Sequence, residues 1–178
     1  MVFRNKFILI ALAAAAFCCS SVNSQVVTAA TAAELIKLAT EYGAPFAKTG
    51  LDRLHSEIFG SDVAARSTDV IIFNKSGKSF KLIANDCEHG GWATGLMPEH
   101  EVQGKQSTVF QMQSHGVMTG VKCLVTYKTN DGIFFELLSD NPYFGKNWVS
   151  ESHSSSLIVT STRGVGNNNQ VRFVIEDA

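Results

Sequence analysis

Cysteine, histidine and glutamate residues gather in two short stretches in the middle of the chain, and these residue types catalyse reactions or bind metals in many proteins. Residues 87–89 read Cys-Glu-His, and residues 99–101 read Glu-His-Glu. Their spacing matches no zinc pattern such as His-Glu-x-x-His. Cys87 could act as a nucleophile only beside a base such as His115, and no motif brings the two together. We therefore predict no catalytic residue, no metal site and no cofactor.

The motifs of the common catalytic and nucleotide-binding loops do not occur in the chain. It contains no Gly-x-Ser-x-Gly nucleophile elbow, no Walker A loop and no dinucleotide fingerprint. The glycine-rich residues 164–167 lie between two strand patterns, which indicates a turn and not a phosphate cradle. The sequence therefore predicts a protein that is not an enzyme.

An aromatic loop over residues 139–148 offers a different chemistry, that of contact with a membrane or a ligand. It holds Tyr143, Phe144 and Trp148 close to Lys146. Aromatic rings beside a cation suit a boundary between water and an apolar phase, such as a lipid headgroup layer. The loop equally fits a surface turn whose rings pack back into the core. Its shape is set by residue types that restrict or relax the backbone, namely Asp140, Asn141, Pro142, Gly145 and Asn147.

Short strand patterns run from residue 68 to the C-terminus and would position this loop. Apolar residues alternate with polar ones at 108–113 and 121–128, and short apolar stretches lie at 133–138, 156–160 and 171–175. Turn-forming residues at 74–77 predict a β-hairpin between 70–73 and 79–84. Residues 85–104 read mostly as loop. Repeated strands with turn signals and no helix between them predict one mainly β domain over 67–178, an antiparallel sandwich or barrel.

The first 66 residues have a different character. Residues 1–24 combine two basic residues, an apolar run too short to span a bilayer and a small-residue site, which predicts a secretory signal cleaved before Gln25. Residues 25–66 read as helical, because Leu35, Leu38 and Tyr42 recur on one helical face and a second amphipathic pattern follows Pro45. These helices could pack on the β domain, form a removable pro-segment or mediate self-association.

Secretion would leave Cys87 and Cys123 as the only cysteines of the mature chain. In an oxidising compartment the two could form one disulfide, although the alternation around Cys123 also fits a buried free thiol. Asn74 begins an Asn-Lys-Ser sequon in the first turn, which makes it a candidate glycosylation site, occupied or not.

The charge of the chain excludes one class of partner. Removing the expected signal takes away two of the 15 basic residues and none of the 16 acidic ones, which leaves a net charge of −3. A nucleic-acid-binding domain carries a basic surplus on one face. We therefore expect no nucleic-acid partner.

Four motifs of the β region resemble those of the aegerolysin family. Residues 89–93, His-Gly-Gly-Trp-Ala, are similar to a glycine-rich loop of the family that ends in Trp, and residues 114–120 resemble its Ser-x-Gly connector. Residues 140–147, Asp-Asn-Pro-Tyr-Phe-Gly-Lys-Asn, look like the family's Asp-Asn-Pro-aromatic-x-Gly-x-Asn loop. Residues 164–168 look like the turn before its last strand. The resemblance is strongest to the aegerolysin-like small components of bacterial binary insecticidal crystal toxins.

The resemblance implies a β-sandwich of two antiparallel sheets that binds membrane lipids, especially sphingolipid-containing ones, without catalysing a reaction. Many members form pores only together with a larger partner protein. The chain departs from the family at three places. Residues 121–123 replace a Thr-Glu-Gly sequence, Gly91 replaces the usual basic residue before Trp92, and Ser139 replaces an aromatic residue.

These observations favour a secreted, non-enzymatic lipid-binding protein of the cytolysin or pore-forming-toxin type. The expected membrane contacts are four aromatic rings and one cation that would meet a lipid phosphate, namely Trp92, Tyr143, Phe144, Trp148 and Lys146. The alternative is a secreted defence module that binds glycans or proteins, because exposed aromatic rings also stack on sugars. For the lipid-binding protein, the expected partners are membrane lipids, in particular sphingolipids. A larger pore-forming partner protein and self-association are further expectations.

Overall fold

The computed structural model describes residues 64–178, and these form eleven strands. The expected signal at 1–24 and the expected helices at 28–60 lie outside the described residues. The strands are β1 (Ser67–Asn74), β2 (Phe80–Ala84), β3 (Cys87–His89), β4 (Gly91–Trp92), β5 (Glu101–Val102), β6 (Ser107–Gln113), β7 (Val121–Lys128), β8 (Phe134–Asn141), β9 (Trp148–His153), β10 (Leu157–Arg163) and β11 (Asn168–Asp177).

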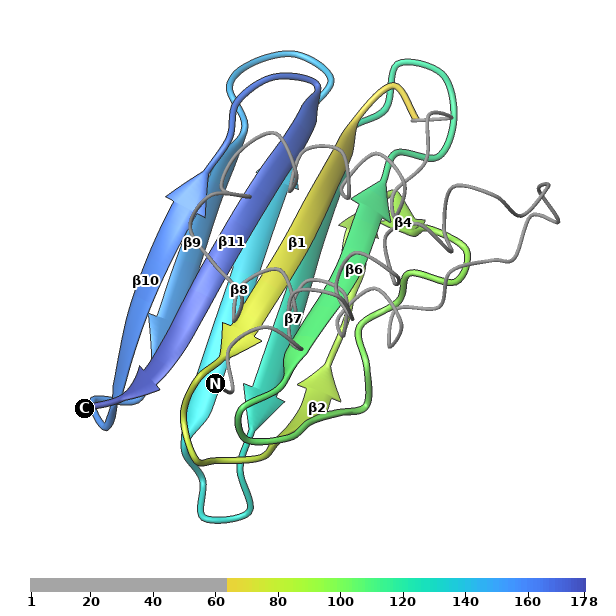
Figure 1. Ribbon diagram of the computed structural model, residues 1–178. Helices are drawn as coiled ribbons and strands as arrows, with labels where there is room; N and C mark the ends of the chain where they lie inside the picture. Colours follow the sequence, from red (N-terminus) through yellow and green to blue (C-terminus); the bar gives the residue numbers. More distant parts are fainter. Residues whose placement is uncertain (1–63) are drawn as a thin grey trace, which may run out of the picture.

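Two sheets stack face to face (Figure 1). Sheet A has the strand order β10-β11-β1-β6-β4, and sheet B has the order β5-β2-β7-β8-β9, with β3 also paired to β7. The described strands form two separate sheets and not a closed barrel. The prediction of a mainly β fold is thereby confirmed for this part of the chain.

The core lies between the sheets and is made of alternate residues of their strands. Phe110 and Met112 point inward from β6, Val125 and Tyr127 from β7, and Phe173 from β11, all at 2% exposure or less. This is the alternation expected of strands with one buried face. The strand patterns at 108–113, 121–128 and 171–175 are confirmed, and the loop at 85–104 contains the three short strands β3, β4 and β5.

One pairing departs from the antiparallel arrangement. β1 runs parallel to β11, with Ser67 opposite Asn168 and Asn74 opposite Ile175, while its other neighbour β6 is antiparallel. The first and last strands of the domain therefore lie side by side in the middle of sheet A (Figure 1). Both sheets are rich in antiparallel pairs, but sheet A is mixed.

The predicted hairpin between the first two strands is wrong. β1 belongs to sheet A and β2 to sheet B, so residues 75–79 carry the chain from one sheet to the other. Turn residues reverse the chain without fixing which strands pair, and both edges of β1 are already occupied by β6 and β11. The buried Asn74 organises the crossing, because its side-chain amide donates to the carbonyl oxygens of Lys78 at 2.8 Å and Gln103 at 2.9 Å.

Cys87 and Cys123 form a disulfide that ties the short strand β3 to β7. Of the two interpretations left open by the sequence, the bonded pair is the one found. The two residues are opposite one another in the register, and 36 positions separate them in the chain. The bond therefore closes a large loop that contains β4, β5 and β6.

Candidate functional site

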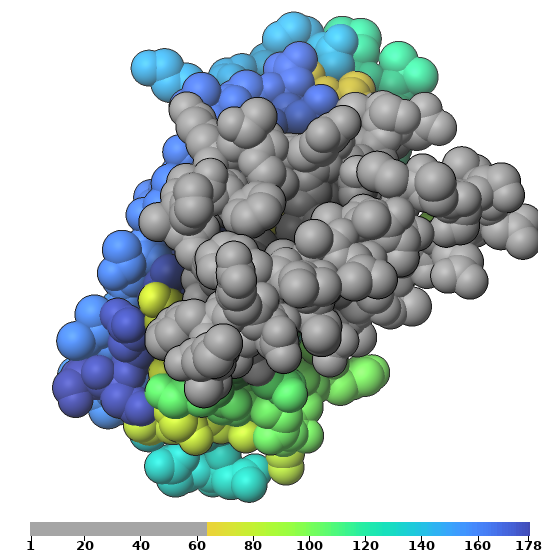
Figure 2. Space-filling model, viewed as in Figure 1, coloured from red at the N-terminus to blue at the C-terminus, as the bar shows by residue number. Residues whose placement is uncertain are grey.

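Three connections meet at one end of the sandwich. Residues 114–120 join β6 to β7, residues 142–147 join β8 to β9, and residues 164–167 join β10 to β11; all three lie at the upper end of Figure 1. Figure 2 shows their atoms gathered side by side at that end. Strand directions alone place them together, because β6, β8 and β10 all run toward this end of the sandwich.

Close contacts and side-chain amides hold these loops against one another. A Cβ added at Gly120 would lie only 2.7 Å from the Cα atom of Pro142, so only glycine allows this approach of two backbones. Asn141 donates from its buried side chain to the carbonyl oxygens of Ser67 and Asn167, both at 2.8 Å. Asn147 donates to Gly166 at 3.3 Å. The loops therefore present a defined surface.

Arg66, just before β1, supports the 142–147 loop from beneath. Its guanidinium donates to the carbonyl oxygens of Pro142 at 3.1 Å and Tyr143 at 2.6 Å, and lies 4.9 Å from the centre of the Tyr143 ring. A charged donor makes stronger hydrogen bonds than a neutral one, and stacking on the ring adds a cation–π attraction. Arg66 therefore fixes the backbone that carries Phe144.

The outermost side chains of these loops are apolar. Val117 is 90% exposed, Val165 87%, Phe144 75% and Met118 58%, and the first three are the most exposed large apolar residues described. We call these four residues the apolar tip. The other exposed apolar side chains lie elsewhere: Ile83 on β2, Ile158 on β10, Trp148 at the start of β9 and Met97 between β4 and β5. Clustering of exposed apolar groups at one end marks a surface that contacts a membrane or another molecule.

The backbone at the tip includes positive φ angles in all three loops. Gly116, Gly145 and Gly166 have φ angles of 107°, 109° and 105°, and Met118 has one of 56°. A left-handed conformation costs an ordinary L-residue about 1–2 kcal/mol, and glycine avoids that cost. A methionine held in this conformation and exposed to water is doubly unfavourable in the free protein, which points to a role in contact.

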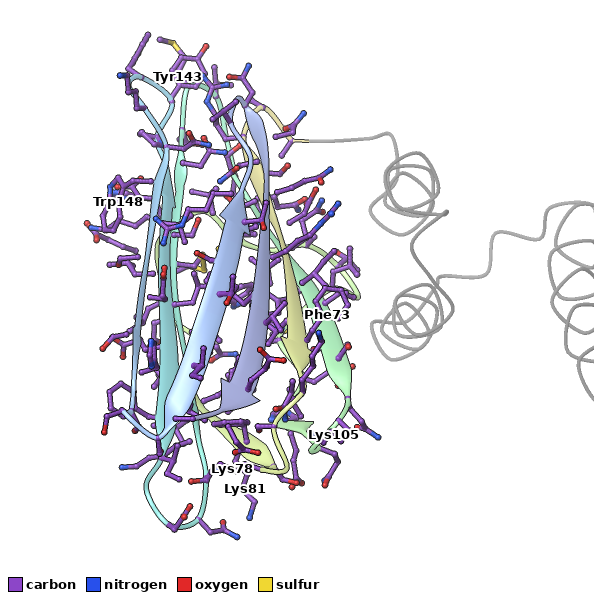
Figure 3. All side chains as sticks on the ribbon, turned by 60° about the vertical axis from the view of Figure 1, so that its left-hand side comes forward. Phe73, Lys78, Lys81, Lys105, Tyr143 and Trp148 are labelled. Carbon is purple, nitrogen blue, oxygen red and sulfur yellow. A yellow bond between two sulfur atoms is a disulfide. The ribbon has the colours of Figure 1, made fainter. Side chains whose placement is uncertain are left out.

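The structure divides the predicted loop residues between the tip and its support. Phe144 and Lys146 are exposed, whereas Tyr143 is half-buried and packs edge-to-face on Phe144 with ring centres 4.7 Å apart. Trp148 starts β9 and is 45% exposed on the outer face of sheet B, opposite Asp140. Figure 3 shows Tyr143 at the end of the sandwich and Trp148 below it, on the side. Trp148 therefore lies beside the tip and not on it.

Trp92 lies farther inside than its expected role requires. Its ring meets Phe110 edge-to-face at 5.9 Å, it packs against the core between the sheets, and its Nε1 donates to the carbonyl oxygen of Asn85 at 3.2 Å. A lipid contact by Trp92 stays a prediction, and its observed contacts are those of a partly buried core residue. The loop-shaping roles of Asp140, Asn141, Pro142, Gly145 and Asn147 also stay predictions. Asn141 and Asn147 donate hydrogen bonds to neighbouring segments, and Gly145 has a positive φ angle.

The sequon at Asn74 is not accessible in the folded domain. The side chain is 2% exposed, and its amide nitrogen, the atom that a glycan would occupy, already donates to two carbonyl oxygens. The Asn74 Oδ1 atom accepts from Ser76 Oγ at 2.6 Å. This geometry argues against glycosylation of the folded protein at Asn74.

Four residues of the site were not predicted from the sequence: Val117, Met118, Val165 and Arg66. The signal for the first three was present, because Gly116-Val-Met118 and Gly164-Val-Gly166 place apolar residues where turns normally carry polar ones. Arg66 had no such signal, since its partners are backbone carbonyls 76 and 77 positions away.

The outer face of sheet B next to the tip carries paired charges. Lys122 on β7 forms a salt bridge with Glu88 on β3 at 2.5 Å. This hydrogen bond lowers the pKa of Glu88 and raises that of Lys122, so both are charged at neutral pH.

Within residues 64–178 no cluster of three metal-binding side chains occurs. No helix of the described region is long and apolar enough to cross a membrane.

The described residues form a β-sandwich of two sheets, and the loops at its apolar end are a candidate binding surface. Comparisons with known proteins agree with the fold alone. No protein-family model matches the chain, and no curated protein matches it. Among solved structures, the lipid-binding protein Nakanori is 16% identical with a TM-score of 0.59, over 86% of this chain and 90% of that one.

Two further solved structures resemble the chain over 65% of its length. The IP-1A protein from Alcaligenes faecalis is 14% identical with a TM-score of 0.54 over 93% of its own chain. The RahU protein, solved in complex with a Tris molecule, is 12% identical with a TM-score of 0.55 over 98% of its own chain. At these identities the likeness shows a shared fold and nothing finer.

Proposed function

We propose that the protein is a secreted, non-enzymatic, membrane-lipid-binding protein of the aegerolysin family, and that the apolar tip is the part that enters the lipid interface. The observation that carries this proposal is the exposure of Phe144, Val117 and Val165, at 75%, 90% and 87%, on three loops fixed to one another. The fold shared with a lipid-binding protein supports it. The four family-like motifs in the sequence support it independently.

The energy available from the tip suits reversible binding. Burying a whole apolar side chain stabilises by about 1.5–3 kcal/mol, so the exposed parts of the four tip residues offer about 5–9 kcal/mol in total. That range corresponds to dissociation constants from about 0.2 mM to about 0.2 µM before the cost of orienting the protein. Rigid loops reduce that cost, because the loops need no ordering on binding.

Headgroup choice rests on the polar residues that surround the tip. Lys146 is exposed in the same loop as Phe144 and would meet a lipid phosphate once Phe144 is buried. Recognition of sphingolipids, and pore formation with a larger partner, follow from the family resemblance and belong to the proposal. A sphingolipid differs from a glycerophospholipid by hydroxyl and amide groups just below the phosphate, at the depth that the tip would reach.

Vesicle co-sedimentation tests the proposal directly. The protein is mixed with phosphatidylcholine–cholesterol vesicles with and without sphingomyelin, alongside the variants Phe144→Ser and Ile158→Ser. Both changes remove one exposed apolar side chain, but Ile158 lies on a strand away from the tip. Phe144→Ser should weaken binding about 5–30-fold, which corresponds to about 1–2 kcal/mol. Ile158→Ser should bind like the wild type.

Three outcomes decide the matter. Binding that depends on Phe144 and not on Ile158 supports the apolar tip as the contact surface. A further requirement for sphingomyelin supports the preference for sphingolipids. No binding to either vesicle type would refute lipid binding through these lipids. Equal loss in both variants would refute the tip as the contact surface.

Trp148 supports a second candidate function, which is the binding of glycans. Its ring is 45% exposed on the outer face of sheet B, with Asp140 opposite it in the register and Lys122 opposite Asp140 on the next strand. An exposed indole beside a carboxylate can stack on a sugar and accept hydrogen bonds from its hydroxyl groups. A glycan array that is positive for the wild type, negative for Trp148→Ala and unchanged for Phe144→Ser would establish this function.

A further inference from the structure

The strand β10 forms one margin of sheet A and is built like a strand that pairs on both sides. Within residues 64–178, the strands β3, β4 and β5 have only two or three residues each, and β9 carries an acidic residue, Glu151, in its middle. β10 has seven residues, which are mostly β-branched and include no glycine, proline or acidic residue. Proteins usually protect an exposed sheet edge by short length, charges, proline or a bulge. β10 has none of these devices in its middle, so its edge is open for pairing.

The backbone of β10 presents hydrogen-bonding groups at this edge. The N–H of Gly164 donates to the carbonyl oxygen of Gln170 at 2.6 Å, which fixes the residues of β10 that bond to β11. In an antiparallel pair only every second residue bonds to a given neighbour. Val159, Ser161 and Arg163 therefore turn their N–H and C=O groups away from β11. Figure 1 shows β10 at the margin, and no described strand pairs with its outer side.

Contacts inside the sandwich hold β10 in a fixed position. Leu157 is 3% exposed and belongs to the core, and Val159 packs against it. Ser161 Oγ donates to Glu151 Oε1 of β9 at 3.4 Å, and Arg163 forms a salt bridge with the same carboxylate. The register between β10 and β11 runs from end to end without a bulge. The edge is therefore straight and needs no ordering before it can pair.

We propose that two copies of this chain pair through their β10 strands, which run antiparallel about a two-fold axis at Thr160. In this register Thr160 faces its own counterpart. Ile158 of each copy faces Thr162 of the other, and their side chains lie on the outer face. Val159 faces Ser161 of the other copy. Because Thr160 is the middle residue of β10, this register pairs the whole strand and forms about six inter-strand hydrogen bonds.

The side chains of β10 and β11 fit a second copy of the same chain. Ile158 is 52% exposed, and the pairing covers it with the methyl group of Thr162. On β11, Glu176 lies opposite Ile158 and Arg172 lies opposite Thr162. Each outer row of the dimer therefore ends in Glu176 of one copy and Arg172 of the other, with Cα atoms about 14 Å apart. Attraction over that distance is weak in salt, but it favours this partner and this register.

The antiparallel arrangement sets the direction of the two apolar tips. β10 runs toward the loop at 164–167, which lies at the tip, and the β10 strand of the second copy runs the opposite way. The dimer therefore carries one apolar tip at each end. If the tips enter lipid, a statement that rests on the proposed function, one dimer bridges two lipid surfaces and each copy binds its own.

Cross-linking of the full chain tests the pairing without lipid, so its failure is distinguishable from failure of the proposed function. Thr160→Cys should form a disulfide between two copies in a glutathione buffer, because the facing Cα atoms lie about 4.5 Å apart. Thr162→Cys, on the same strand, and Ser150→Cys, on β9, are controls at positions that are also exposed. The Thr160→Cys link should form at least about tenfold faster than either control. Mass spectrometry of the linked peptides identifies the bond.

A charge exchange at the two-fold axis tests the pairing without a covalent bond. In Thr160→Lys and in Thr160→Glu, each new side chain faces a like charge. The dissociation constant of the dimer, measured by sedimentation, should therefore rise about 3–10-fold in each variant. An equal mixture of the two variants should regain the dimer, because opposite charges then face each other. Thr160 is exposed, so neither change alters the core.

Three lipid-free results would overturn the inference. The first is an equal cross-linking rate for Thr160→Cys and its controls, because the thiols would then meet by collision alone. The second is a wild type that stays monomeric up to about 1 mM, where even weak interfaces associate. The third is a dimer that is equally stable in the wild type, in Thr160→Lys and in Thr160→Glu, because β10 would then not be the interface.

Light scattering of vesicle suspensions tests the direction of the tips. The wild type should cluster the vesicles that it binds, and Thr160→Lys should bind them equally but cluster them severalfold less. Binding by the wild type without clustering would overturn the arrangement with one tip at each end. Loss of vesicle binding itself would refute the proposed function, and the lipid-free measurements would still decide whether the dimer forms.

Discussion

Removal of the Cys87–Cys123 disulfide should cost the domain a large part of its stability and leave the proposed lipid contact unchanged. The bond closes a loop of 36 positions. In the chain-entropy treatment, a loop of that length restricts the unfolded state by about 13 cal/mol/K, which is about 3.8 kcal/mol at 25 °C. Replacing both cysteines by alanine also removes a sulfur atom at Cys123, which is 1% exposed, and adds about 1 kcal/mol.

The double variant Cys87→Ala/Cys123→Ala should therefore lose about 4–5 kcal/mol, a large share of the 5–15 kcal/mol typical of a domain. Urea unfolding, followed by the fluorescence of Trp92 and Trp148, measures the loss. The denaturant slope should also rise, because an unfolded chain without the cross-link exposes more surface. Dithiothreitol should shift the wild-type transition in the same direction and leave the double variant unchanged.

Two results would refute this reasoning. One is a double variant whose midpoint and slope equal those of the wild type. The other is a large loss of vesicle binding under conditions where the double variant is still folded, because the tip is held by Arg66, Asn141 and Asn147 and not by β3. Hydrogen exchange should instead increase locally at residues 87–89, where only two register pairs hold β3 to β7.

Three further predictions concern single residues. Met118→Gly relieves a left-handed φ of 56° and should raise the free energy of unfolding by up to about 1 kcal/mol in urea, while vesicle binding weakens severalfold; a loss of stability would contradict the strain. Burial raises the pKa of Glu99, so the wild type loses stability as pH rises through that pKa. The Glu99→Gln variant should therefore have a higher free energy of unfolding than the wild type at pH 7, and this difference should disappear near pH 4. An equal difference at both pH values would argue against a raised pKa of Glu99. Arg66→Ala removes the guanidinium beneath Tyr143 and should increase hydrogen exchange in residues 142–147, with unchanged exchange there counting against its supporting role.

The sequence predicted the strands well where one face is buried. β6, β7 and β11 alternate because one side of each meets the core, and alternation is visible in the residues themselves. The partner of β1 was not visible. The turn after it is chemically the same whether the chain folds back in one sheet or crosses to the other, and β11 comes 101 positions later.

The candidate site was found in part, for a related reason. Phe144 stood out because aromatic residues beside Asn-Pro and Lys are unusual in a turn. Val117 and Val165 belong to the same surface only because their loops lie with the 142–147 loop at one end of the sandwich. That placement depends on strand direction and register. Trp92 looked like an exposed ring in its glycine-rich setting, but its inward direction follows from the pairing of β4 with β6 opposite Met112.

The parallel pairing of β1 with β11 has a consequence for how the protein is made. During synthesis, β1 leaves the ribosome about 100 residues before the strand that completes its sheet, a delay of about 5–20 s at ordinary translation rates. Throughout that interval the apolar run from Val70 to Phe73 lacks a partner on one side, and such a segment readily pairs with other chains.

A chain with this topology is therefore expected to depend on chaperones that keep it unfolded until its last residues have left the ribosome. A premature stop that removed only β11 would withdraw a strand from the centre of sheet A and not from its edge. Such a truncated product should be degraded.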